Sequence, residues 1–237
     1  MSWISEHNKN WLRIVALTVI LGSFVYWVER DILPDEYNPL KPLEISDEIT
    51  FLTSNKINNL KGKYQDCLAI LKNSGVKFEP LPDKTTGESC GLYNTVHLLQ
   101  SDITYGGGIT LKCPALVSLL IWEKQALQPL AAEILQQPIT RVKHFGTYAC
   151  RNVNGAPKGR RSQHAFANAI DIAGFVLADG SQISVLKDWG KDNPSGKFLA
   201  AIHKSACDLF TTVLGPDYNE HHHNHFHFDH GSSGICE

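Results

Sequence analysis

An uncharged apolar stretch near the N-terminus constrains the fold of this chain most. It runs from Ile14 to Val28, which is shorter than the roughly 20 residues that a membrane-crossing helix needs. The flanking Trp11 and Leu12 can lengthen it at the membrane interface. Lys9 and Arg13 precede the stretch, and positive residues favour the cytoplasmic side. The sequence therefore predicts a cytoplasmic N-terminus and an exported remainder.

The residues at the end of this stretch favour an anchor that is not cleaved. Tyr26 and Trp27 stand where a small-x-small cleavage site would be needed, and such aromatic residues suit the membrane interface. We expect residues 1–30 to form a signal anchor, with one pass through the inner membrane and the C-terminal domain in the periplasm. The alternative is a buried core helix, since short apolar stretches are common in cores.

The six cysteines all follow the apolar stretch. An even number of cysteines in an exported segment predicts disulfides, although six cysteines allow 15 pairings. No CxxC pair occurs, which argues against a zinc ribbon or a thioredoxin site. Six reduced thiols in a cytosolic protein are the alternative. The cysteines are Cys67, Cys90, Cys113, Cys150, Cys207 and Cys236.

Composition and charge indicate a globular chain. Apolar residues make up 43% and charged residues 19%, and the net charge is -2, so we expect no nucleic-acid partner. Pro34, Pro39 and Pro42 lie among charges after the apolar stretch, which is typical of an extended spacer. We expect a spacer over residues 31–55 and one folded domain over residues 56–237.

Hydrophobic periodicity predicts a mixed α+β domain. Helical spacing is found over 56–74, 114–137 with a break near Pro129, and 196–215. Strand patterns are found over 76–81, in two runs over 95–113, over 139–150, as a hairpin over 169–186, and over 225–229 as the final strand. Residues 83–91 have the composition of a loop. We expect an antiparallel sheet with helices on one face.

One carboxylate lies inside an apolar run. Asp171 is flanked by apolar residues in "AIDIAGF", and a charge buried there is costly unless it is paired or bound to a metal. The alternatives are a turn-capping aspartate or a pair with Arg160 or Arg161. His164, seven residues earlier, is by itself more typical of a surface histidine.

A second candidate segment lies near the C-terminus. His225 and His227 alternate along the strand "HFHFD", so both point to one face while Phe226 and Phe228 point to the other. Such a pair suits a metal but is also common by chance. We expect the neighbouring histidines at 221–223 to be a solvated loop.

Together the two segments resemble a known group of zinc peptidases. The group includes D-alanyl-D-alanine dipeptidases and carboxypeptidases, murein endopeptidases and lysostaphin. The segment His225-Phe226-His227 resembles its second motif. Its first motif resembles Ser162, His164, Ala167, Ala169 and Asp171.

The sequence is more similar still to the bacterial extensin-like C-terminal domain family. The resemblance runs from about Cys67 to Cys236, and the cysteines stand where that family has them. It is carried by "CPALVSLLIWE", "HFGTYACRN", "SQHAFANAIDIAGF", "VLGPDYN" and "HFHFD".

The resemblance implies a D-Ala-D-Ala metallopeptidase or hedgehog-like core and one zinc ion. Its ligands would be His164, Asp171 and His227. His225 would accept a proton or stabilise an oxyanion. Arg151 would orient the substrate.

Two further residues receive roles from the same resemblance. Ser162 would contact substrate or hold the His164 loop, and Asp229 would orient a histidine. Asn224 departs from the pattern, because the dipeptidases carry a glutamate base at this place and an amide cannot take up a proton.

The function expected from this resemblance is a membrane-anchored, zinc-dependent hydrolase that cuts D-amino-acid peptide bonds in peptidoglycan. Its partners would be peptidoglycan and, through the N-terminal helix, the inner membrane. Asn224 favours a non-catalytic, zinc-containing cell-wall-binding module as the alternative. A disulfide-rich structural accessory of an envelope complex is a third possibility, against which the intact ligand set argues.

Overall fold

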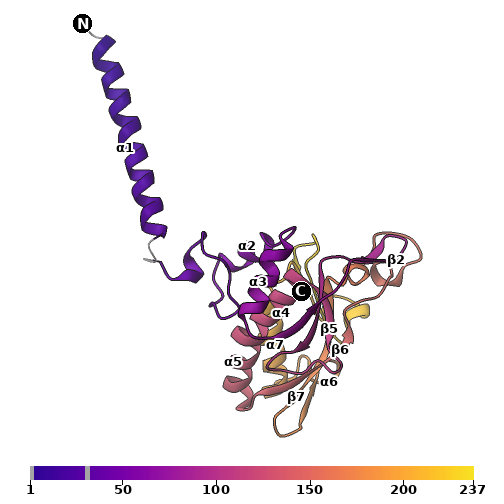
Figure 1. Cartoon of the computed structure of the whole chain (residues 1–237). Coiled ribbons are helices and arrows are strands. Elements are labelled where there is room, and N and C mark those ends of the chain that lie inside the picture. Colours follow the sequence, from indigo (N-terminus) through magenta and orange to yellow (C-terminus); the bar gives the residue numbers. More distant parts are fainter. Residues whose placement is uncertain (1–2, 30–32) are drawn as a thin grey trace. The chain divides into compact units, whose positions relative to one another are not determined.

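The computed structural model describes residues 3–29 and 33–237, which fall into two compact units, Met1–Pro42 and Leu43–Glu237. The ends of the predicted anchor and the start of the spacer, at residues 1–2 and 30–32, lie outside the described residues. The first unit contains helix α1 (Trp3–Glu29) and the short 3-10 helix η1 (Asp35–Tyr37), as Figure 1 shows.

Helix α1 is long and apolar enough to cross a membrane. The stretch Lys9–Val28 has a mean hydropathy of 1.8, and only 6% of it is buried. Leu17, Ile20 and Leu21 are among its exposed side chains. The alternative of a buried core helix is therefore wrong for α1. Its properties suit a membrane anchor and are shared by signal sequences.

The second unit begins at Leu43, earlier than the expected boundary at residue 56. Leu43 and Ile45 are buried in the hydrophobic core, so the second half of the expected spacer packs with the domain. Burying these two apolar side chains is favourable, and the proline-containing segment ends just before them at Pro42.

The expected helix over 56–74 is two helices. Helix α2 spans Thr53–Asn58 and helix α3 spans Tyr64–Asn73. Between them Gly62 has a φ of +82°, a conformation that glycine adopts readily and that interrupts a right-handed helix. The apolar spacing continues across the turn, which explains why the sequence alone predicts one helix.

The largest sheet has six strands in the order β11-β9-β10-β7-β6, with β8 paired to β7. Its pairs are antiparallel except for β11 and β9, which are parallel. The expected antiparallel sheet and the 169–186 hairpin are thus confirmed, whereas β10 is not the final strand. The strands are β6 (Ile139–Gly146), β7 (Ala169–Leu177), β8 (Gln182–Ser184), β9 (Thr212–Leu214), β10 (Phe226–Asp229) and β11 (Ile235–Cys236).

Two smaller sheets complete the strands of the described chain. Strands β1 (Lys77–Pro80), β4 (Thr95–Gln100) and β5 (Ile109–Lys112) form a sheet in the order β1-β4-β5. Strands β2 (Lys84–Gly87) and β3 (Cys90–Leu92) form a hairpin where the sequence predicts a loop. The threonines of β2 favour the extended conformation, and Ser89 at φ 53° lies in the turn.

A helical segment follows β5, beginning with α4 (Cys113–Trp122), which has Pro114 in its first turn as expected. It continues through π-helical η2 (Glu123–Leu127), α5 (Gln128–Leu130) and π-helical η3 (Ala131–Leu135). Pro129 has no backbone N–H to donate, and this is consistent with the irregular hydrogen bonding around it.

Helix α7 (Pro194–Ala206) is shorter than the expected 196–215. The β-favouring residues after Phe210 form β9 instead. A short helix, α6 (Val185–Asp188), precedes α7.

The helices α4 and α7 pack on one face of the large sheet. Phe226 and Phe228 of β10 are fully buried on this face. The ring of Trp122 in α4 contacts Phe228 at a centroid distance of 5.5 Å, and Phe198 in α7 contacts Phe175 of β7 at the same distance. The predicted arrangement of helices on one face is confirmed, and the opposite face of β7 and β10 is left for the polar residues.

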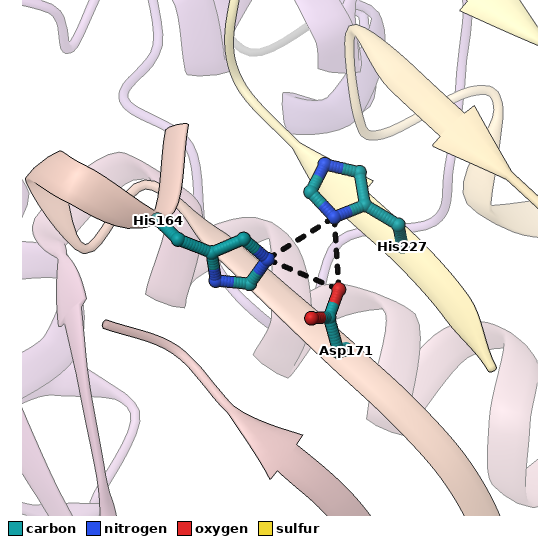
Figure 2. Close-up of side chains that lie close together, drawn as sticks. All are labelled: His164, Asp171 and His227. Atoms are coloured by element: carbon teal, nitrogen blue, oxygen red, sulfur yellow. Dashed lines mark hydrogen bonds and ion pairs between the residues drawn. The ribbon is translucent and has the colours of Figure 1, made fainter. Parts of the chain in front are cut away.

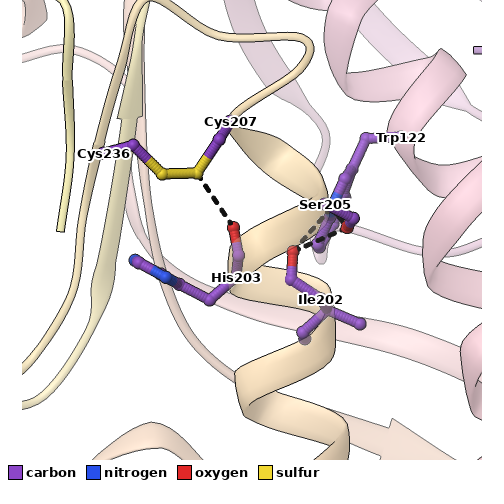
Figure 3. The surroundings of a disulfide bond; sticks show 6 residues. All are labelled: Trp122, Ile202, His203, Ser205, Cys207 and Cys236. Carbon is purple, nitrogen blue, oxygen red and sulfur yellow. Dashed lines mark hydrogen bonds between the residues drawn. A yellow bond between two sulfur atoms is a disulfide. The ribbon is translucent and has the colours of Figure 1, made fainter. Parts of the chain in front are cut away.

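Three disulfides join distant segments, which confirms the expected disulfides and excludes the alternative of reduced thiols. Cys67–Cys113 joins α3 to α4, and Cys90–Cys150 joins β3 to the loop after β6. Cys207–Cys236 ties the end of α7 to β11, and Cys207 Sγ lies 3.8 Å from the His203 carbonyl oxygen (Figure 3).

A buried carboxyl group makes the stability of this core depend on pH. Burial raises the pKa of Glu123 to about 7, although hydrogen bonds from Tyr105 and Ser101 act in the opposite direction. Folding favours the neutral carboxyl group. The stabilisation that Glu123 gives the folded state is therefore complete below pH 4.5 and is lost as the pH rises through 7. We expect the contribution of Glu123 to the free energy of unfolding to fall by about 3 kcal/mol over this range. Denaturant unfolding should show a change of this size in the difference between the native chain and Glu123→Gln, because the buried histidines titrate alike in both chains.

Candidate metal site

Strand pairing brings the two candidate segments together. In the register of β7 and β10, His227 lies directly opposite Asp171. His164 comes from the short helix η5 (Gln163–Phe166), which Ser162 caps by accepting a hydrogen bond from the His164 N–H at 3.3 Å. Ala167 then adopts a left-handed φ of 50° and leads the chain into β7. This turn directs His164 toward the centre of the strand pair.

The three expected ligand atoms are in mutual contact (Figure 2). Asp171 Oδ1 lies 3.0 Å from His164 Nε2 and 2.9 Å from His227 Nδ1. The two ring nitrogens are 3.2 Å apart. All three residues are buried, at 2%, 7% and 8% exposure for His164, Asp171 and His227. In the described part of the chain, they form a group of donors that could hold a metal ion.

His225 lies beside this group. Its Nε2 is 3.4 Å from Asp171 Oδ1, and it points to the same side of the sheet as His227, as the alternation predicts. Phe226 and Phe228 lie on the helix-covered face. The ring of the exposed Phe145 packs against the edge of His225 at a centroid distance of 5.6 Å.

In each of the three histidines around Asp171, the outer ring nitrogen, which points away from Asp171, lies close to an oxygen atom. His227 Nε2 lies 2.9 Å from Asp229 Oδ2, and His164 Nδ1 lies 3.3 Å from the Thr147 carbonyl. His225 Nδ1 lies 2.8 Å from Asn224 Oδ1. If each outer nitrogen carries the proton and donates it, the inner nitrogen presents a lone pair to Asp171. Several lone pairs and a carboxylate then face one another, which a cation would stabilise.

This donor set fits zinc. Two imidazoles and one carboxylate are the ligands of many zinc sites, and tetrahedral zinc separates its donor atoms by roughly 3.3 Å. Burial raises the pKa of Asp171, but when the inner nitrogens of His164, His225 and His227 carry protons, their hydrogen bonds to the carboxylate outweigh burial and hold its pKa well below the usual range. Asp171 is therefore a carboxylate, as a metal ligand must be.

Comparison with known protein families identifies the family of this chain. The model of the extensin-like protein C-terminus matches residues 65–237, which include every candidate site residue. The chain belongs to the extensin-like family. No curated protein and no solved structure matches the chain.

One functional candidate of the extensin-like domain is missed by the sequence analysis. His222, expected in a solvated loop, is 8% exposed, whereas His221 and His223 are exposed. Its ring lies 5.3 Å from that of His225 and 5.7 Å from that of His227, between centroids. Burial and the charges of these two histidines lower the pKa of His222 to about 4.

A sequence feature could have identified this residue. Asn219 caps the 3-10 helix η6 (Glu220–His222), and its Oδ1 lies 2.8 Å from His222 Nδ1. An asparagine three residues before a histidine is typical of a capped helical turn, and such a turn fixes the direction of its last side chain.

A pocket of about 340 Å³, here called the site pocket, opens beside the candidate metal-binding group. Asp171, His225 and His227 line it, together with Arg151 and Ser162. Arg151 follows Cys150, which is held by its disulfide to Cys90. The site pocket thus brings together an arginine, two of the candidate histidines and the carboxylate.

The alternative partners of Asp171 have other contacts. Arg161 donates to Asn152 Oδ1 at 3.0 Å and to the Glu88 carbonyl at 2.8 Å. Arg160 lies 3.4 Å from Ser233 Oγ. Asp171 is therefore paired with histidines and not with either arginine in the described structure.

Proposed function

We propose that this protein is a membrane-anchored, zinc-dependent hydrolase of peptide bonds in peptidoglycan, acting on D-amino-acid linkages. The observation that carries the proposal is the contact of His164 Nε2, Asp171 Oδ1 and His227 Nδ1 at 2.9–3.2 Å. Of these residues, Asp171 and His227 line the site pocket. We infer further that the domain has the core of the D-Ala-D-Ala metallopeptidases.

The roles of the residues follow from their positions. His164, Asp171 and His227 would hold one zinc ion, and Asp229 would keep His227 in the correct tautomer. A bound zinc ion supplies Lewis-acid polarisation of the scissile carbonyl and a water of lowered pKa. Arg151, at the pocket wall, would bind a carbonyl or carboxylate oxygen of the substrate.

His225 is the proposed proton carrier. Because its Nδ1 faces the Asn224 amide oxygen, Nε2 is left to accept a proton. In hydrolysis, the water oxygen forms a bond to the carbonyl carbon and the C–N bond breaks. His225 Nε2 accepts the proton of the water and returns it to the leaving amine. Asn224 would thus position His225 as the base, although the Asn224 amide cannot itself accept a proton.

The N-terminal helix and the disulfides support the proposed location. Disulfides persist in oxidising compartments such as the periplasm, and three are present in the domain. Lys9 and Arg13 lie before the apolar core of α1, which favours a cytoplasmic N-terminus. We propose that α1 anchors the domain at the inner membrane on the periplasmic side, next to peptidoglycan.

Digestion of purified sacculi tests this function. The zinc-loaded protein should release muropeptides, and a chelator should stop the release until zinc is returned. A non-catalytic, zinc-containing wall-binding module is the second candidate, favoured by the absence of an acid at position 224. Such a module would pellet with sacculi, contain zinc and release nothing, which would overturn the proposed hydrolase.

Substitution of Asn224 tests its positioning role. Asn224→Ala removes the acceptor for the His225 Nδ1–H, so we expect kcat to fall about 10- to 100-fold with little change in KM. Asn224→Asp retains an acceptor oxygen and should recover most of the rate. Muropeptide release should be measured beside zinc content, which neither variant should alter. Full activity in Asn224→Ala would exclude the role.

A further inference from the structure

A second pocket, here called the lysine pocket, lies outside the candidate metal site. Its volume is about 410 Å³, and Lys61, Lys112, Tyr93 and His230 are among the residues that line it. These four residues come from separate segments, after α2, at the end of β5, after β3 and after β10. The disulfide Cys67–Cys113 fixes the neighbouring α3 and α4. The pocket is therefore built from several cross-linked parts of the domain.

The positive charge of the lysine pocket is not compensated within it. Among the described residues, neither Lys61 nor Lys112 forms an ion pair, and no aspartate or glutamate lines the pocket. Lys112 Nζ lies 5.5 Å above the centre of the Phe166 ring. Burial lowers the pKa of Lys112, and the charge of Lys61 lowers it further. An anion in this pocket would relieve the repulsion between the two ammonium groups.

Tyr93 gives the pocket a fixed aromatic wall. Its hydroxyl lies 2.6 Å from Thr85 Oγ1, and its ring lies so close to Gly91 that a Cβ there would be 2.2 Å from Tyr93 Cε2. The side chain is nevertheless 38% exposed. Because the Tyr93 ring is exposed but already fixed in place, a ligand could pack on its apolar surface at little cost in conformational entropy.

His230 leaves a polar atom without a partner in the wall of the pocket. The residue is 5% exposed, and its Nε2 lies 2.7 Å from Ser118 Oγ. Its Nδ1 is buried and has no hydrogen-bond partner in the described structure. A buried polar atom of this kind costs free energy until a ligand or water meets it.

The lysine pocket and the site pocket share a wall. Gln163 lines both pockets, and its Oε1 accepts a hydrogen bond from Asn168 Nδ2 at 2.7 Å. On the other side, the Gly231 N–H donates to Asp229 Oδ1 at 2.6 Å, and Asp229 contacts His227. A Cβ at Gly231 would lie 2.9 Å from Gln163 Nε2. The two pockets are therefore neighbours on the domain.

We propose that the lysine pocket is a second binding site, in which Lys61 and Lys112 bind a carboxylate of a peptidoglycan peptide. Tyr93 would cover the apolar part of the ligand next to that carboxylate. The proposal rests on the proposed function only for the identity of the polymer.

A short wall fragment, which the presence of a chelator keeps uncleaved, provides the test. N-acetylmuramyl-L-alanyl-D-glutamate is titrated by calorimetry into the full chain in detergent, with a chelator present, in parallel with its fully amidated form. The carboxylate form should bind the native chain at least about tenfold more tightly than the amide. The double variant Lys61→Gln, Lys112→Gln should lose this preference, and Lys61→Arg, Lys112→Arg should keep it. Lys72→Gln, an exposed lysine on α3, is the matched control and should bind as the native chain does.

The outcomes separate this proposal from the proposed function. Equal binding of the acid and the amide, or an unchanged preference in the glutamine double variant, would overturn the lysine site even if sacculi are cleaved. Carboxylate-dependent binding in a chain that cleaves nothing would support the lysine site and contradict the hydrolase. Competition by inorganic phosphate as strong as that by the acid form would overturn the assignment to a carboxylate. Thermal unfolding of each variant establishes that it is folded.

Discussion

Replacing His225 with alanine is expected to lower the rate of muropeptide release by about 10²- to 10⁴-fold while the chain keeps its zinc. The reason is positional. His225 Nε2 is 3.4 Å from Asp171 Oδ1, but His225 lies outside the group of three donors formed by His164, Asp171 and His227. Its loss should remove the proton carrier and leave the metal-binding atoms in place.

The comparison requires two measurements on one preparation, namely the zinc content and the initial rate of release from sacculi. His223→Ala is the matched control, because His223 belongs to the same histidine-rich segment but is exposed, and both its zinc and its rate should be unchanged. Parallel loss of zinc and activity in His225→Ala would instead make His225 a ligand. An unchanged rate would exclude it as the proton carrier.

The second large effect concerns the core beneath the site. Phe228→Ala is expected to lower the free energy of unfolding by about 3–5 kcal/mol. Phe228 is fully buried and packs against Trp122 at 5.5 Å and Phe210 at 5.2 Å, between ring centroids. It stands next to His227 on β10, so the cavity would form directly behind the strand that carries the candidate ligand. The free energy can be measured by denaturant unfolding of the full chain.

Phe145→Ala is the matched control for this prediction. Phe145 is 61% exposed, so its removal should change the free energy of unfolding by less than about 1 kcal/mol. Similar losses for the two variants would show that the Phe face of β10 is not the buried face of the sheet.

The directions of the side chains on β10 could be predicted because strand alternation is a strong local pattern. The convergence of His164, Asp171 and His227 was implied by the resemblance to the zinc peptidases. "HFHFD" alternates polar and apolar residues, which fixes His227 and Phe228 on opposite faces whatever lies around them. Asp171 in an apolar run required a partner for its charge. Both inferences depend on one residue and its immediate neighbours, and the pairing of β7 with β10 satisfies both.

Features that depend on distant contacts were not predicted. The disulfide pairs follow from the packing of α3 on α4 and of α7 beside β11, which no local pattern encodes. The burial of His222 depends on Tyr218 and on the neighbouring histidines of β10, with its ring 5.6 Å from that of Tyr218. Gly62 and the parallel strand β11 likewise take their conformations from the tertiary fold.

The central claim is that His164, Asp171 and His227 share one zinc ion, and the metal content of the purified full chain tests it most directly. The account predicts about one zinc per chain in the native protein and in His223→Ala, and almost none in Asp171→Asn, which removes the carboxylate but retains the shape of the side chain. A native chain that binds no zinc after incubation with the ion, or an Asp171→Asn chain that keeps a full equivalent, would contradict the account.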